Sequence, residues 1–136
     1  HLTTDNLVNT GRSPAIKPVV FRDYRLIKEG DKVEHFIYTG SSDVHGGFPI
    51  GSGAIVSASP IILFVDNMEK FQRRELRLIT YIRVEYGIVG STLRYFTEIT
   101  SEVYWHGTKV DPNTNHITPN VGLGAIGQQN GVGIVR

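Results

Sequence analysis

The sequence predicts an all-β fold, an antiparallel β-sandwich with one short helix near residues 67–73. Two observations predict it. Almost every periodic segment of the 136 residues alternates apolar and polar side chains with period two, which is typical of half-buried strands. Turn-forming glycine, proline and asparagine residues separate these segments, as they do in an all-β domain of short and long strands.

The first half of the chain is expected to contain a hairpin and a long loop. Residues 1–15 are polar and predict an arm or linker ahead of a single domain over residues 16–136. Segments 17–29 and 32–39 alternate well enough to be the two strands of a hairpin. Residues 40–53 contain five glycines and predict a loop that is long for a domain of this size.

A helix and two long strands are expected in the middle of the chain. An apolar strand region bent at Pro60 comes first, and Asn67 is then a candidate N-cap for the helix. The long strands span residues 75–86 and 91–105. From Gly107 onward the chain is rich in glycine, asparagine and proline, so we expect a tail with one short strand at its end.

The two faces of the first long strand differ in character. One face, with Leu78 and Ile82, is expected to line the core, and the other carries four charged residues. Plain solvation of a sandwich surface explains a charged and aromatic face. The alternative is an interaction face, because arginine and aromatic residues are enriched where proteins bind proteins. Its candidate residues on the two long strands are Arg77, Tyr81, Arg83, Arg94, Phe96 and Tyr104.

Composition narrows the classes of function. The formal net charge of +1 is too balanced for a chain that mainly neutralises nucleic-acid phosphates. Without cysteine the chain has no disulfides, thiolate metal sites or cysteine nucleophiles. No apolar run approaches the roughly 18–20 residues that a membrane span requires. The histidine at position 1 suggests a processed product or an excised domain.

The stretch FQRRELRLITYIRVEYGIV, Phe71 to Val89, resembles a segment of picornavirus-like coat proteins. In that segment a short helix leads into a central jelly-roll strand, a basic pair precedes the strand, and the strand contains an aromatic-x-Arg-x-acid pattern. Here Tyr81, Arg83 and Glu85 carry that pattern. The resemblance implies a jelly-roll-like shell or protruding domain of a virion. Its partners would be copies of itself or sibling coat subunits, with a host receptor or glycan as a further partner.

Two other classes of function remain open. A carbohydrate-binding or peptide-binding module would use exposed aromatic residues such as Trp105, Tyr104 and Phe48. A small hydrolase would use the 41–53 loop, where Asp43 and His45 lie close to serines and to a His-Gly-Gly sequence.

The residues favour a contact role for this loop. It lacks the Gly-x-Ser-x-Gly turn that presents a nucleophilic serine, so we expect Asp43, His45 and Phe48 to make contacts and not to catalyse a reaction. The histidines outside position 1 have no metal-ligand spacing with one another. We therefore expect neither an enzyme nor a cofactor.

Overall fold

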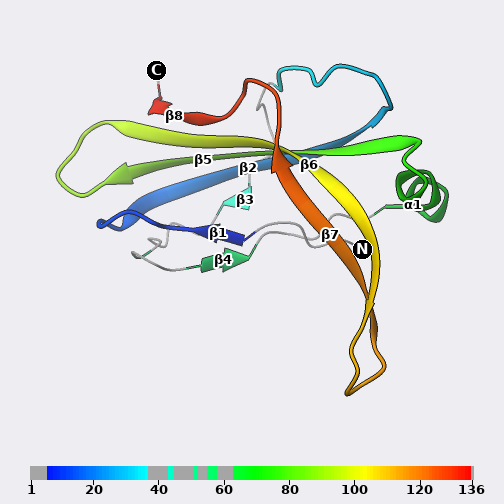
Figure 1. The fold of residues 1–136 in the computed structure, drawn as a ribbon. Coiled ribbons are helices and arrows are strands. Elements are labelled where there is room, and N and C mark those ends of the chain that lie inside the picture. Colours follow the sequence, from blue (N-terminus) through cyan, green and yellow to red (C-terminus); the bar gives the residue numbers. More distant parts are fainter. Residues whose placement is uncertain (1–5, 37–42, 45–50, 52–54, 58–62, 136) are drawn as a thin grey trace.

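The computed structural model describes residues 6–36, 43–44, 51, 55–57 and 63–135, which form eight strands and one helix (Figure 1). No helix in these residues is long and apolar enough to cross a membrane. In chain order the elements are β1 (Asn6–Val8), β2 (Ala15–Lys28), β3 (Asp43–Val44), β4 (Ile55–Ser57), α1 (Val65–Gln72), β5 (Leu76–Ile88), β6 (Arg94–Val110), β7 (Ile117–Ala125) and β8 (Gly131–Ile134).

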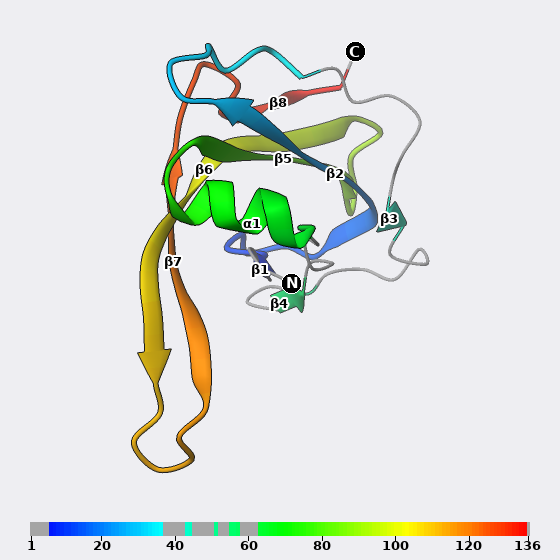
Figure 2. The ribbon, with the colours of Figure 1, turned by 90° about the vertical axis from the view of Figure 1, so that its right-hand side faces the viewer.

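Six of the strands form one antiparallel sheet in the order β3-β2-β5-β6-β7, and β8 also pairs with β6. Strands β1 and β4 form a separate two-stranded sheet. Helix α1 and this small sheet lie on the same side of the large sheet, as Figure 2 shows. The all-β prediction and its single short helix are confirmed, whereas the sandwich and its jelly-roll arrangement stay predictions.

The helix begins earlier than the sequence predicts. Its N-cap is Phe64, which makes no side-chain capping bond, and Asn67 lies inside the first turn, so the capping role predicted for Asn67 is wrong. Packing outweighs capping here, because Phe71 is buried against the sheet. The helix therefore gains its stability mainly from tertiary contacts.

The hairpin expected over residues 17–39 is wrong in its described part. Strand β2 pairs with β5 instead, and residues 31–36 have no regular strand structure. They cover the face of the large sheet that lies opposite α1, where Phe36 stacks on Tyr81 with ring centroids 4.7 Å apart. The alternation of residues 32–36 thus reflects the burial of Phe36 and not strand pairing.

The expected polar arm and glycine-rich tail both contain strands. Residues 6–8 of the arm pair with β4 as β1. The tail supplies β7 and β8, and β6 continues to Val110. Two glycines of the tail lie directly under aromatic rings of β6: a Cβ on Gly133 would stand 2.7 Å from the Phe96 ring, and one on Gly124 would stand 3.1 Å from the Tyr104 ring. Glycine therefore marks close ring contacts in these strands, not a loop.

Strand β5 is buried on both faces at its centre, from Leu78 to Ile82. On the α1 side, Leu78 packs with Phe71 and Val103. On the opposite side, Ile79 and Tyr81 pack under residues 31–36 and Ile126. Leu78 and Ile82 lie in the core as predicted. Tyr81 was expected to face solvent, and that expectation is wrong, because its side chain is 1% exposed.

Truncation of Tyr81 to alanine is expected to lower the free energy of unfolding by about 3–5 kcal/mol, as for other buried aromatic residues. Tyr81→Phe keeps the stacking on Phe36 and loses only a 3.4 Å bond to the carbonyl of Glu34, so we expect a cost below about 1.5 kcal/mol. Tyr24→Ala, at an exposed position on β2, is the control. Urea denaturation measures all three, and equal effects of Tyr81→Ala and Tyr24→Ala would contradict the burial of Tyr81.

Candidate functional site: an open cavity beside strand β6

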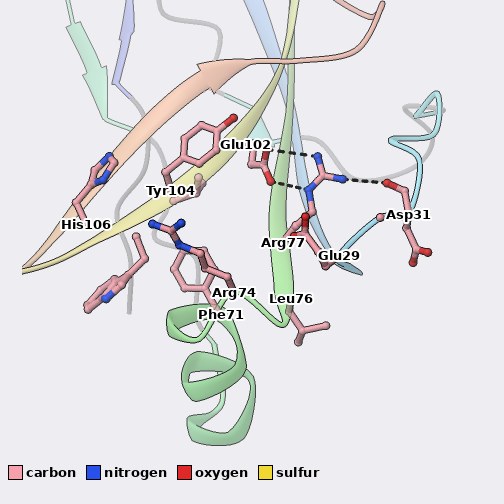
Figure 3. Close-up of a pocket in the computed structure, with 12 residues that line it drawn as sticks. Glu29, Asp31, Phe71, Arg74, Leu76, Arg77, Glu102, Tyr104 and His106 are labelled. Atoms are coloured by element: carbon pink, nitrogen blue, oxygen red, sulfur yellow. Dashed lines mark hydrogen bonds and ion pairs between the residues drawn. The ribbon is translucent and has the colours of Figure 1, made fainter.

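An ion pair joins β5 and β6 at one end of the sheet. Arg77 donates to both carboxylate oxygens of Glu102, with Nε to Oε1 at 2.6 Å and Nη2 to Oε2 at 3.3 Å. A third donor, Nη1, binds the carbonyl of Asp31 at 2.9 Å (Figure 3). Bidentate pairing of this kind is among the strongest side-chain interactions, so Arg77 is committed to fixing β5, β6 and the turn after β2.

The ion pair between Arg77 and Glu102 determines the ionisation states of these two side chains and of the neighbouring Tyr104. The hydrogen bonds from Arg77 lower the pKa of the Glu102 carboxyl, and the same bonds raise the pKa of Arg77. Bonding to Glu102 also raises the pKa of the neighbouring Tyr104 hydroxyl. All three effects favour the charged pair and a neutral tyrosine at neutral pH.

A second cluster lies further along the same face. Arg83 binds Glu85 through Nε at 3.1 Å and Glu98 through Nη1 at 3.2 Å. Its guanidinium carbon stands 3.9 Å from the centroid of the Phe96 ring, which adds a cation–π contact. Arg83 is thus satisfied within its own subunit.

The predicted interaction face is therefore only partly available to a partner. The side chains of Arg77 and Arg83 are 21% and 19% exposed and both are paired, and Tyr81 is buried. Arg94 is half-buried and donates to the carbonyl of Lys17 at 3.0 Å. In this set only Tyr104 is largely exposed to solvent. The role of this face in binding stays a prediction.

The predicted loop contacts fall mostly outside the described residues. Asp43 lies in β3, where its backbone pairs with Val20, and His45 and Phe48 are not described. The hydrolytic and contact roles of this loop thus remain untested. Among the described residues, no three histidine, aspartate or glutamate side chains come together as a metal site would require.

An open cavity of about 550 Å³ lies between the turn after β2, the α1–β5 turn and β6. Its apolar wall consists of Phe71, Leu76, Val103 and Trp105, and the rings of Phe71 and Trp105 meet edge to face at 6.3 Å. Figure 3 shows its polar walls: Arg74 and His106 lie on one side, and Glu29 and Asp31 lie on the other. The Arg77–Glu102 pair lies between these sides.

Sequence reasoning considered Trp105 and Tyr104 but missed Arg74. The basic pair Arg73-Arg74 precedes β5, and nothing in its spacing says which of the two faces a cavity. The backbone conformation turns the side chains of Arg73 and Arg74 in different directions. Arg73 binds Glu69 on the helix, whereas Arg74 has φ of 62°, which turns its side chain toward the cavity.

Comparisons of this chain with protein-family models, with curated proteins and with solved structures give no significant match. Its function is therefore argued from the geometry of its own residues.

Replacement of Glu102 by glutamine should flatten the dependence of stability on pH. The folded-state pKa of Glu102 is lowered, so its stabilising contribution is full above the unfolded value of about 4.3 and is lost as pH falls through the folded value. We expect Glu102→Gln to lower the free energy of unfolding by about 1.5–3 kcal/mol at neutral pH and by less in acid. Urea denaturation at several pH values between 3 and 7 measures this.

The control for this experiment is Glu69→Gln, which removes an exposed i, i+4 pair with Arg73 and should cost less than about 0.5 kcal/mol at every pH. Stability curves of Glu102→Gln and the unmodified protein that coincide at every pH would show that the Arg77–Glu102 pair makes no net contribution.

Proposed function

We propose that this chain is a structural and interaction domain that associates with copies of itself through the end of its β6–β7 hairpin, and that it serves as a shell or protruding domain of a viral coat protein. The observation that carries the proposal is the β6–β7 ribbon, defined as residues 108–119. It continues beyond the large sheet and projects from it, as Figures 1 and 2 show.

The β6–β7 ribbon is exposed along its whole length, and its apolar residues are exposed with it. Val110 is 58% exposed and Ile117 is 69% exposed, and the two face each other in the register of the two strands. Two-stranded hairpins are marginally stable in water without a third strand or a helix to pack on. A contact that covers these side chains would therefore stabilise the ribbon itself.

A second copy of the chain fits this ribbon. The net charge of +1 leaves little overall repulsion between copies. The ribbon also carries both signs of charge, Lys109 and Asp111, next to the apolar pair. In an isologous contact each copy presents the same patch, so the apolar pairs would be buried together and each lysine could reach the partner's aspartate.

The arrangement around β5 supports the coat-protein setting. Helix α1 leads through a short turn into β5, which is a central strand of the large sheet, and this is the order on which the resemblance of Phe71 to Val89 rests. The long, exposed ribbon supports it too, because extended arms are suited to contacts with neighbouring subunits. The small formal charge agrees with a piece that does not itself bind the genome.

Charge introduced into the ribbon should abolish self-association. We expect the unmodified protein to associate at about 100 μM, and the double variant Val110→Asp, Ile117→Asp to bind itself at least about tenfold more weakly, which corresponds to about 1.4 kcal/mol. Sedimentation equilibrium measures both. Circular dichroism should show an unchanged fold, because neither residue belongs to the core.

The control is Val89→Asp, which places one such charge on a comparably exposed valine between β5 and β6, and the single variant Ile117→Asp is its match in charge. Val89→Asp should associate like the unmodified protein. A protein that is monomeric at the highest concentration tested, or a ribbon variant that associates as well as the control, would overturn the proposal.

A further inference from the structure

Beside the cavity, no described strand pairs with the β5 side of β6, and we call this stretch the open edge of β6. The pairing of β5 with β6 ends at Leu78 and Val103, whereas β6 continues to Val110 and pairs there with β7 alone among the described strands. The backbone of Thr100 bonds toward the β7 and β8 side, accepting from Ile126 N–H and donating to Asn130. Alternation along the strand then turns the N–H and C=O of Trp105 toward the open side.

Arg74 stands at this edge in a strained backbone conformation. Its φ of 62° lies in the left-handed region, and any residue other than glycine loses free energy when it adopts this conformation. No described residue forms an ion pair with its guanidinium, unlike the neighbouring Arg73 and Arg77. Figure 3 shows the Arg74 side chain directed into the cavity toward the side of His106. This conformation belongs to the turn that ends α1, where the N–H groups of Arg74 and Glu75 donate to the carbonyls of Phe71 and Lys70. It leaves a cation that no described residue pairs at a place where a ligand would contact it.

The charge and the shape of the cavity together indicate which kind of ligand it would bind. An open strand edge offers backbone donors and acceptors in a row, which an extended peptide matches by strand addition. The apolar wall around Trp105 suits an apolar side chain of such a peptide. The acidic residues lie away from Arg74, with Glu102 paired to Arg77 and with Glu29 and Asp31 across the cavity. An anionic side chain therefore has one favourable position, beside Arg74 and His106.

We propose that this cavity is a peptide-binding site, in which an extended segment of a partner protein adds to the open edge of β6 and places a carboxylate against Arg74. The site is independent of the β6–β7 ribbon, so it can bind whether or not the chain self-associates.

The single tryptophan of the chain, Trp105, lies in the cavity and reports binding directly by its fluorescence. The probe is a short blocked peptide, Thr-Val-Glu-Val-Thr, titrated into the intact protein, with Thr-Val-Lys-Val-Thr as its matched partner. We expect saturable binding of the acidic peptide, at least about tenfold tighter than that of the lysine peptide. Glutarate carries two carboxylates and no peptide group, so it tests the attraction of anions without strand pairing, and we expect it to bind at least about tenfold more weakly than the acidic peptide.

Three variants of Arg74 separate binding from folding. Arg74→Lys should keep binding within about tenfold, and Arg74→Glu should reverse the preference toward the lysine peptide. Arg74→Gly should weaken binding of the acidic peptide at least about tenfold while it raises Tm by roughly 2–5 °C, because glycine relieves the strain. Arg73→Ala, which removes the neighbouring guanidinium from the helix side, should bind the acidic peptide normally.

Several results would overturn the proposal. These are the absence of a saturable fluorescence change with the acidic peptide at millimolar concentration, equal binding of the two peptides, and glutarate binding as tight as that of the acidic peptide. Loss of stability without loss of binding in Arg74→Gly would likewise show that Arg74 has a structural role only. None of these outcomes depends on the oligomeric state that tests the proposed assembly.

Discussion

The fold depends on a bridge between two segments that have no regular structure of their own. The side-chain amide of Gln129 accepts a hydrogen bond from the N–H of Phe36 and donates one to its carbonyl, both at 2.8 Å, across 93 positions of sequence. We refer to this pair of bonds as the Gln129 bridge. It supplies the backbone N–H and C=O of Phe36 with the partners that a neighbouring strand would supply. The bridge is buried, so its loss would leave polar groups without these partners inside the protein.

The Gln129 bridge helps to determine which residues of the charged face of β5 and β6 are buried and which are exposed. With residues 31–36 held over the sheet, Ile79 and Tyr81 are buried on the face that faces away from α1. The arginines at the edges of this covered region are partly shielded from solvent, and each forms ion pairs with carboxylates. Arg77 pairs with Glu102, and Arg83 pairs with Glu85 and Glu98. The charged residues thus join strands to one another, and the surfaces that we propose for partners are the β6–β7 ribbon and the cavity around Trp105.

Local sequence patterns predicted those helices and strands that depend mainly on residues close together in the sequence. Period-two alternation predicted β5, the first part of β6 and the core positions Leu78 and Ile82, and composition predicted a short helix close to α1. The same patterns missed contacts that are distant in sequence. The burial of Tyr81 depends on Phe36, and the strands of the glycine-rich tail depend on rings of β6 that cover Gly124 and Gly133. Arg74 could not be distinguished from Arg73, because only the backbone conformation at the end of α1 separates their directions.

The most direct test of this account is hydrogen exchange at the amide of Phe36 in Gln129→Ala, with Gln128→Ala at the exposed neighbouring position as the control. The account predicts that the Phe36 amide exchanges slowly in the unmodified protein and in Gln128→Ala. In Gln129→Ala it should lose its protection, and the free energy of unfolding should fall by about 2–5 kcal/mol, since two buried hydrogen bonds are removed. A Phe36 amide that stays protected in Gln129→Ala, with unchanged stability, would contradict the claim that the Gln129 bridge holds the cover of the sheet in place.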